Sequence, residues 1–383
     1  MSPKRRFVCT FMIAVLAASV AHAEPARDRL GVNIHEWGVY ENPAKVIADL
    51  NYLGIRHVRA NNTSNVDLLR VYAKAGIKFD LLVGGQPFDP KVVLPRLEAL
   101  AAATPGTIEA IEGFNEIDHW PVTYQGSTGP DAAIAAMKAL YIMVKADPRL
   151  GKVPVFDLTG APQGSPRIGD YVNEHLYPNA AGNPLPDYAT RLPPGTPKVI
   201  TEIGSFSLPS DWPSGKAWWG SPSMLGVDER TQAKSILNIF AAALWGNAYR
   251  VYVYELLDEG VSVKDATMHF GLFRADNSPK PAAVAVRNLL ARLGDATVAS
   301  DPIAIEAPAS VHHIVLRKSD GSLIVAIWNV VPFWRDGPLD APAVPVEITP
   351  PKGTKVASVY DPLTGETSSA VAAPDHVVLV SLH

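Results

Sequence analysis

Short apolar runs alternate with helical patterns along most of the chain, from about Arg29 onward. Between the runs, segments such as PAKVIADLNYLG and DAAIAAMKALYIMVKA carry apolar residues at three- and four-residue steps. The runs typical of buried strands are LGVNIH (30–35), RHVRA (56–60), KFDLLVG (78–84), IEAIEGF (108–114), VPVFDLT (153–159), DYVNEHLY (170–177), KVIT (198–201) and YRVYVYEL (249–256). This alternation predicts a parallel sheet with crossover helices, and eight evenly spaced strands predict a (β/α)8 TIM barrel. A doubly wound sheet is the alternative, but no Gly-rich phosphate turn opens a helix in this sequence.

The pattern changes after Leu293. VHHIVLR and LIVAIW flank the polar turn Lys-Ser-Asp-Gly-Ser, which predicts a hairpin. VPVEI, KVASVYD and HVVLVSL follow, separated by turns rich in Pro and Gly. We therefore predict a catalytic barrel over residues 24–295 and a small antiparallel β-sandwich over residues 296–383.

Two glutamates stand at the ends of predicted strands. Glu116 follows IEAIEGF in the segment EGFNEID, and Glu202 follows PKVI in the segment VITEIG, 86 residues later. One βα unit of such a barrel takes about 31 residues, so this spacing is close to three units. It places the two carboxylates at the C-terminal ends of the fourth and seventh strands, where barrels hold their catalytic residues. Two acids that face each other are what cleavage of a glycosidic bond requires.

These segments resemble the clan A glycoside hydrolases, a group of retaining barrel enzymes with Asn-Glu on strand four and Glu on strand seven. EGFNEID is similar to that group's Glu-x-aromatic-Asn-Glu-Pro-Asn/Asp, with Ile117 where Pro is usual. The tail GLFRADNSPKPAAVAVRNLL makes family 39, with its β-xylosidases and exopolysaccharide hydrolases, the nearest group. The resemblance covers about residues 29–295 and implies an O-glycosyl hydrolase.

The resemblance implies a role for each of the central residues. Glu116 is the expected general acid/base, and an apolar environment formed by Phe114 and Trp120 is expected to raise its pKa. Asn115 is expected to bind the 2-hydroxyl of the sugar, and Glu202 is the expected nucleophile. Each glutamate taken alone could equally be a solvated residue at a strand end.

Three further side chains are expected around these glutamates. Arg59, at the end of the second strand, resembles the group's arginine that positions the nucleophile, although His57 shares its face of the strand. His175 and Tyr177 lie two residues apart on the sixth strand, so both can face the same side. Tyr177 is expected to donate a hydrogen bond to Glu202, and the alternative is a core tyrosine at the barrel rim.

Sugar rings stack on indole rings, so tryptophans in loops at the barrel top are candidate subsites. Trp37 follows the first strand, Trp120 follows the fourth, and Trp218 and Trp219 lie in the long loop 205–228. These indoles could instead seal the barrel against the sandwich. Glu255 and Asp258, after the eighth strand, are candidates either for contacts with sugar hydroxyls or for capping the barrel rim.

The N-terminal residues have the pattern of a secretion signal. Lys4, Arg5 and Arg6 precede an apolar stretch that ends in Ala21-His22-Ala23, which predicts cleavage near Ala23. The apolar stretch is too short for a membrane anchor, so a secreted or periplasmic protein without an integral membrane span is expected. The single cysteine, Cys9, lies inside this signal, which leaves no thiol for disulfides or metal in the mature chain.

The net charge and the spacing of the histidines argue against nucleic-acid binding and against a metal site. The net charge is −4, which argues against nucleic acid as a partner and fits a carbohydrate substrate. Ten histidines are scattered without His-x-His on a strand or His-Glu-x-x-His, so we predict no metal site and no cofactor. The sequence thus predicts an exported retaining glycoside hydrolase. The alternatives are a non-catalytic carbohydrate-binding barrel and a barrel hydrolase that uses a metal.

Overall fold

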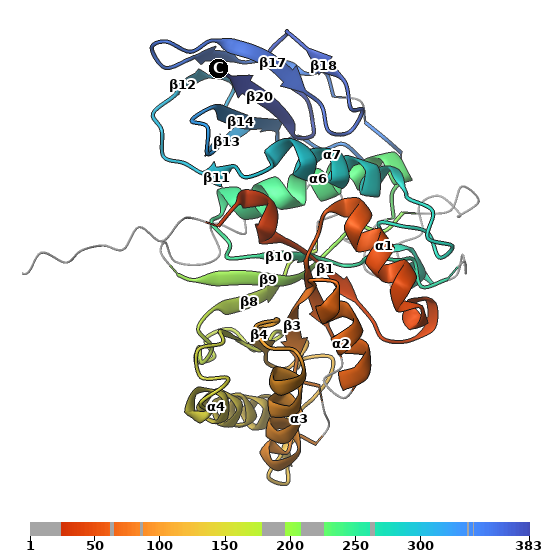
Figure 1. The fold of residues 1–383 in the computed structure, drawn as a ribbon. Helices are drawn as coiled ribbons and strands as arrows, with labels where there is room; N and C mark the ends of the chain where they lie inside the picture. The colour runs from red at the N-terminus through yellow and green to blue at the C-terminus, as the bar shows by residue number, and fades with distance from the viewer. Residues whose placement is uncertain are drawn as a thin grey trace, which may run out of the picture.

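A computed structural model describes residues 24–61, 65–84, 87–177, 196–207, 226–260, 265–334, 337–339 and 341–383 of this 383-residue chain (Figure 1). The predicted signal segment 1–23 and the candidate subsites Trp218 and Trp219 therefore lie outside the described residues.

Eight parallel strands form the central sheet, in the spatial order β7-β4-β3-β2-β1-β10-β9-β8. Their bounds are β1 (Leu30–Ile34), β2 (His57–Ala60), β3 (Lys78–Leu82), β4 (Ile108–Glu112), β7 (Val155–Phe156), β8 (Val172–His175), β9 (Lys198–Ile203) and β10 (Val251–Val253). A parallel bridge between Phe156 of β7 and Tyr171, just before β8, joins the two ends of the sheet. All eight predicted strands are present, and the predicted barrel fold is confirmed.

Helices surround most of the barrel, as a parallel sheet requires of its crossovers. They are α1 (Pro43–Leu53), α2 (Val66–Lys74), α3 (Pro90–Ala103), α4 (Pro130–Ala146), α6 (Glu229–Trp245) and α7 (Pro281–Leu293). Side chains that accept a backbone N–H begin four of them: Asn42, Asn65, Asp89 and Asp228. Gly54, at φ 79°, ends α1 in the left-handed conformation that glycine adopts without steric cost.

The fifth βα unit departs from the regular pattern. Residues 157–171, between β7 and β8, contain no helix. Asp157 holds this loop in place of a helix, because its carboxylate accepts hydrogen bonds from the backbone N–H groups of Leu158 and Ile168. A two-stranded hairpin, β5 (Thr123–Tyr124) and β6 (Ser127–Thr128), is inserted between β4 and α4. Both departures lie next to the fourth and fifth strands.

The C-terminal part consists of antiparallel sheets. The largest has the order β11-β13-β14-β20-β17-β18. Its strands are β11 (Thr297–Val298), β13 (Val311–Arg317), β14 (Leu323–Asn329), β20 (Val378–Leu382), β17 (Val356–Tyr360) and β18 (Thr367–Ser368). Two small sheets, β12 (Ala304–Glu306) with β16 (Glu347–Thr349) and β15 (Val344–Pro345) with β19 (Ala372–Ala373), pack on one of its faces. The predicted β-sandwich is confirmed.

Helices α6 and α7 lie between the barrel strands and the C-terminal sheets (Figure 1). The contact includes a buried ion pair, Lys234 Nζ to Asp375 Oδ2 at 2.8 Å, and the rings of Trp245 and His312, 4.8 Å apart. Because α6 is covered on both sides, even its polar residue Gln232 is buried. One apolar core continues from the barrel into the sandwich. The limits 24–295 and 296–383 remain a prediction.

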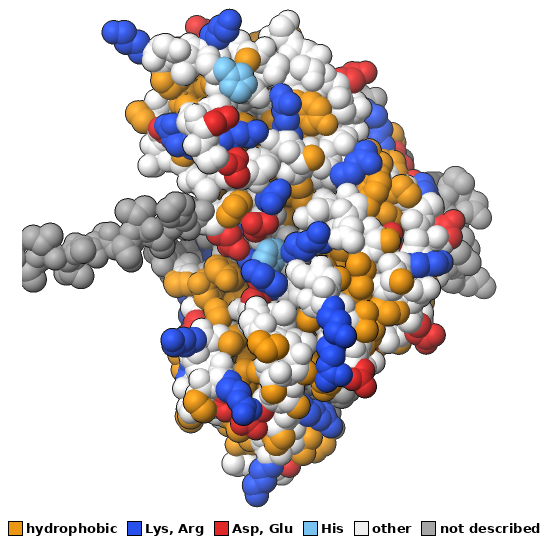
Figure 2. Space-filling model, in the orientation of Figure 1, with side chains coloured by type: hydrophobic (Ala, Val, Ile, Leu, Met, Phe, Trp, Pro, Cys, Tyr) orange, Lys and Arg blue, Asp and Glu red, His pale blue; other side chains and the backbone are white. Residues whose placement is uncertain are grey.

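Basic and acidic side chains are intermixed over the face of the molecule shown in Figure 2, on the barrel and the sandwich alike. Among the helices described, none is long and apolar enough to span a membrane.

Candidate active site

The two candidate catalytic glutamates lie at the same end of the barrel. Glu202 is the fifth residue of β9, and Glu116 follows the end of β4 by four residues. The φ of Glu116 is 41°, in the left-handed region that non-glycine residues seldom adopt. Its backbone N–H donates to Thr159 Oγ1 at 2.8 Å, and Ile117 N–H donates to the Thr159 carbonyl at 3.0 Å. The loop after β7 therefore fixes the turn that presents Glu116.

Arg59, on β2, is the centre of the hydrogen-bond network. Its guanidinium holds both oxygens of Glu112, at 2.6 Å and 2.9 Å. It also donates to Glu202 Oε1 at 2.8 Å, to Asn33 Oδ1 at 3.0 Å and to Asn115 Oδ1 at 2.7 Å. Burial opposes the charge of Arg59, but Glu112 and Glu202 raise its pKa above the ordinary value. Arg59 therefore stays protonated and places the proposed nucleophile and Asn115 relative to each other.

Glu112 is the structural counter-ion of this network. It is fully buried, and its Oε1 also accepts hydrogen bonds from Asn173 Nδ2 at 3.0 Å and Thr201 Oγ1 at 2.9 Å. Below it, His57 lies on the same face of β2 as Arg59, but its Nδ1 pairs with Glu109 at 2.8 Å. His57 and Glu109 lie near the starts of their strands, so of the two candidates on β2 only Arg59 reaches the glutamates.

Both oxygens of Glu202 are held. Tyr177 Oη donates to Oε2 at 3.1 Å, while Arg59 binds Oε1. Burial, followed by the charge of Glu202, raises the pKa of Tyr177 well above its ordinary value, so its hydroxyl stays a hydrogen-bond donor. The contact predicted between Tyr177 and Glu202 is present. A phenol and a guanidinium thus each donate to one oxygen of Glu202 and fix the orientation of its carboxyl group.

His175 bridges the two glutamates. Its Nδ1 lies 2.8 Å from Glu116 Oε1 and 3.2 Å from Glu202 Oε2. Because both neighbours are carboxylate oxygens, Nδ1 carries a proton. Carboxylate oxygens of the two glutamates lie within 4.8 Å of each other.

The expected raised pKa of Glu116 is wrong. The hydrogen bond from His175 is the largest influence, and it holds the pKa of Glu116 below its ordinary value despite partial burial. The two aromatic residues expected around Glu116 differ in burial. Phe114 packs against Phe88, with ring centroids 5.1 Å apart, and Trp120 is 64% exposed.

Of the four tryptophans expected to stack on sugar rings, the structure describes two. Trp37 and Trp120 are 51% and 64% exposed, as residues that stack on a sugar must be. Trp218 and Trp219 lie outside the described residues. Glu255 is completely buried, and Asp258 pairs with Lys280 at 2.7 Å, so Asp258 braces the barrel rim.

A second cluster of titratable groups lies past β1 and β10. His35 Nε2 is 3.1 Å from Glu255 Oε2 and 3.3 Å from Glu259 Oε1. Sequence reasoning did not single out His35, Glu259, Tyr254 or Thr159. His35 and Thr159 end predicted strands, and Glu259 follows one. Catalytic residues of barrels lie at the C-terminal ends of strands, and this rule, which identified the two glutamates, could also have found these three.

Two groups among the described residues have ligand atoms close enough to share a metal ion: Glu116, His175 and Glu202, and His35, Glu255 and Glu259. In the first group, Arg59 and Tyr177 already occupy both oxygens of Glu202. The guanidinium charge there opposes a divalent cation. This group fits proton transfer and nucleophilic attack better than metal binding.

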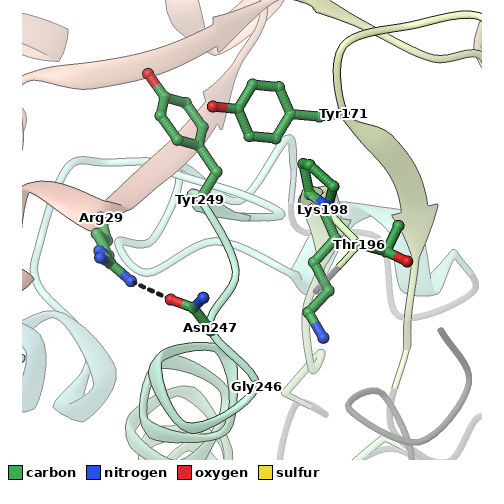
Figure 3. Close-up of a pocket in the computed structure, with 8 residues that line it drawn as sticks. Arg29, Tyr171, Thr196, Lys198, Gly246, Asn247 and Tyr249 are labelled. Carbon is green, nitrogen blue, oxygen red and sulfur yellow. Dashed lines mark hydrogen bonds between the residues drawn. The ribbon is translucent and has the colours of Figure 1, made fainter. Parts of the chain in front are cut away.

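A pocket of about 320 Å³ lies at the opposite end of the barrel (Figure 3). Arg29 and Asn247 approach it from one side, and Tyr171 and Tyr249 lie on another. Lys198, which also lines it, begins β9, whereas Glu202 lies four residues further along. At about 3.3 Å per residue, the pocket is roughly 13 Å from the glutamates along the strand. It is therefore separate from the candidate active site.

No protein-family model matches this sequence, and no curated protein matches it. Solved structures do match. A family 39 glycoside hydrolase from the gut symbiont Bacteroides cellulosilyticus WH2 aligns with a TM-score of 0.62 at 15% identity, over 94% of this chain and 81% of that chain. The family 39 enzyme from Xanthomonas axonopodis pv. citri aligns with a TM-score of 0.59 at 14% identity, over 94% and 95%.

This chain has the fold of the family 39 glycoside hydrolases. A family 2 β-galacturonidase from Eisenbergiella tayi, solved with galacturonate bound, is also similar, with a TM-score of 0.51 at 15% identity. That match covers 71% of this chain and 52% of the β-galacturonidase. The two family 39 structures thus share the whole architecture, whereas the family 2 enzyme is similar over about half of its own length.

Proposed function

We propose that this protein is an exported retaining glycoside hydrolase that cleaves a polysaccharide or oligosaccharide by double displacement. The observation that carries the proposal is the pair Glu116 and Glu202, whose oxygens lie within 4.8 Å and which His175 bridges. Carboxyl groups of retaining enzymes lie about 5–5.5 Å apart, and those of inverting enzymes about 6.5–9.5 Å apart. The likeness in fold to glycoside hydrolases supports the same reaction class.

In the first step, Glu202 attacks the anomeric carbon and forms a glycosyl ester. Glu116 donates its proton to the leaving oxygen as the glycosidic bond breaks. Arg59 and Tyr177 donate to the two oxygens of Glu202 and hold it in position for the attack.

In the second step, Glu116 removes a proton from water, which attacks the anomeric carbon and releases Glu202. Asn115, held by Arg59 at 2.7 Å, is in position to donate its amide hydrogens to the sugar 2-hydroxyl in both steps. Two inversions leave the product with the configuration of the substrate.

Two alternatives make different predictions. A non-catalytic carbohydrate-binding barrel would bind glycans and hydrolyse none. A barrel hydrolase that uses a metal would lose activity in chelator. A panel of bacterial exopolysaccharides and plant glycans, read by product mass with and without chelator, separates the three. A bacterial exopolysaccharide is the first candidate substrate.

The stereochemistry of the product tests the double displacement directly. We expect the first-formed product to keep the anomeric configuration of the substrate, because the carboxylate separation leaves no room for a water molecule behind the sugar. Proton NMR of the anomeric signal during the first minutes of the reaction measures this. A first product of inverted configuration would refute the mechanism.

The contact between His175 and Glu116 predicts a pH dependence. Glu116 must be protonated to act as the acid, and His175 holds its pKa below the ordinary value. The value of kcat/KM, which reports the free enzyme, should therefore fall on the alkaline side from an acidic pH onward. Substituting His175→Gln removes the contact, so the pKa of Glu116 should rise and this limb should move to higher pH.

Aryl glycosides with activated leaving groups supply the control for the pH experiment. They need no proton from Glu116, so their kcat/KM should lack the alkaline limb in both proteins. An alkaline limb that stays at the same pH in His175→Gln would mean that another group sets it.

A further inference from the structure

The second cluster lies directly beside the proposed nucleophile. His35 follows β1, and Glu255 and Glu259 follow β10. Strand β10 pairs with β9, which carries Glu202, and with β1. The three residues therefore occupy the edge of the site next to Glu202, on the side away from Glu116. The double displacement uses none of them.

The cluster has more acceptors than donors. Glu255 Oε2 accepts from Tyr40 Oη at 2.9 Å, but Glu255 Oε1 is buried and has no hydrogen-bond partner within the described part of the chain. Burial, together with the neighbouring Glu259, raises the pKa of Glu255 well above its ordinary value. Burial also lowers the pKa of His35, so this ring supplies little positive charge. A ligand with several N–H donors would satisfy the buried Glu255 Oε1, and a positive charge on it would also stabilise the ionised carboxylates.

The position of the imidazole proton favours a donor group over a metal ion. Asn61 Nδ2 lies 3.0 Å from His35 Nδ1, and with the amide in this orientation Nδ1 accepts its hydrogen. The ring proton then lies on Nε2, the atom that faces Glu255 and Glu259. In this arrangement a metal ion would have to displace the Nε2 proton, whereas a ligand that is itself a donor would bind the carboxyl oxygens directly.

Aromatic rings beside the cluster supply a surface for a sugar. Trp37 is 51% exposed, and its ring centroid lies 4.7 Å from that of His35. Tyr254, partly exposed, lies 5.8 Å from His35 and precedes Glu255 in the chain. The side chain of Glu259 is 21% exposed, so a ligand can approach the cluster from its side.

We propose that this cluster selects a sugar that carries a free amino group and excludes a sugar acid. The inference rests on the proposed glycosidase function and names its substrate class. An ammonium group brings one positive charge and three donors to Glu255 Oε1 and Glu259 Oε1. A uronate would place a third carboxylate against these two. The galacturonate bound by the Eisenbergiella tayi enzyme is such a sugar acid, the class of ligand that this cluster would exclude.

Binding to three matched oligosaccharides tests this proposal without requiring turnover. The background is the full chain with Glu202→Gln, which cannot cleave. The ligands are chitosan, chitin and cellulose oligomers of equal length, which share their linkage and differ at carbon 2 of every unit: amine, acetamide or hydroxyl. Asn115 is assigned to carbon 2 of the sugar that is cleaved, so the cluster would bind the amine of a neighbouring unit. Calorimetry at about pH 6, where a sugar amine is charged, and at 0.15 M salt measures each Kd. We expect the chitosan oligomer to bind at least about tenfold more tightly than the other two.

A second substitution locates the selectivity. Adding Glu259→Gln should remove most of the preference for the chitosan oligomer. Glu306→Gln, on exposed β12 of the sandwich, removes the same charge far from the site and should keep the preference. This control separates recognition at the cluster from the general attraction of a cationic chain to an acidic protein, and melting temperatures verify that each variant is folded.

The outcomes are distinct. Equal or weaker binding of the chitosan oligomer, or no binding at all, overturns the inference, as does a preference that survives Glu259→Gln. Titration with Zn²⁺ or Ca²⁺ that binds the parent but not Glu259→Gln also overturns it, because the cluster would then be a metal site. Preferred binding of chitosan by a protein whose wild type cleaves no glycan would leave the inference standing and refute the proposed hydrolysis.

Discussion

Replacing Glu202 with alanine should abolish hydrolysis of every substrate, whereas replacing Glu116 with alanine should spare substrates that need no acid. Without Glu202 no glycosyl ester can form, whatever the leaving group. Without Glu116 the leaving oxygen receives no proton, which should cost roughly 10²–10⁴ on natural glycans. An acidic phenol leaves an aryl glycoside as the phenolate and needs no proton. The first step with such substrates should therefore change little. The values of kcat/KM, which report the steps up to formation of the glycosyl ester, measure the difference on one natural and one activated substrate. Overall turnover would not, because Glu116 also activates water in the second step.

Asp118→Ala is the matched control for this pair of substitutions. Asp118 is a carboxylate two residues after Glu116, its side chain is 56% exposed, and it contacts His119 at 3.6 Å. Its loss should leave most activity on both substrates. If Glu116→Ala and Glu202→Ala lose the same factor on natural and activated substrates, the roles assigned to them are wrong. If Glu116→Ala keeps full activity on natural glycans, the proposed mechanism has no acid.

The barrel strands could be predicted because each is a short apolar run bounded by polar turns. β9, predicted over residues 198–201, is present over Lys198–Ile203 with every residue buried. The absence of a helix after the fifth barrel strand, β7, could not be predicted. Residues 157–171 form a loop there that hydrogen bonds to the Asp157 carboxylate hold in place. A buried carboxylate that accepts backbone N–H groups leaves no periodic signal in the sequence.

The central part of the site followed from strand order and alternation. Arg59, Tyr177 and Glu202 end adjacent or facing strands, and the two-residue period of strands places His175 beside Tyr177. Their contacts are present, while their catalytic roles remain a proposal. The direction of the pKa shift of Glu116 could not be derived in this way. It depends on which of several neighbours points at one carboxylate, and the hydrogen bond from His175 outweighs burial there.

The second cluster shows the same limit. His35 ends the first predicted strand and Glu259 follows the eighth, 224 positions later, and the pairing of β1 with β10 brings them together. Glu255 was singled out as a possible contact for sugar hydroxyls or a cap of the rim. It is instead buried, and its Oε1 finds no donor among the residues that the structure describes.

Replacing Arg59 with methionine should lower both stability and activity. The substitution leaves Glu112 fully buried without its counter-ion, and such a loss costs about 3–5 kcal/mol. Nearby Asp80 cannot replace the guanidinium: burial and then Glu112 raise its pKa, and a carboxyl group is neutral or negative in either protonation state. Glu202 loses the hydrogen bond at 2.8 Å that aims it. Urea unfolding and kcat on an activated aryl glycoside measure the two effects.

The double variant Arg59→Met/Glu112→Gln separates the two roles of Arg59. Removing the uncompensated charge of Glu112 should restore most of the lost free energy of unfolding, since neutral partners of similar shape cost little when buried together. Activity should stay low, because Glu202 and Asn115 still lack the guanidinium that positions them. Glu112→Gln alone, which keeps Arg59 in contact with Glu202, should be the more active protein. Recovery of activity in the double variant would mean that Arg59 serves the barrel core and that Tyr177 suffices to orient the nucleophile.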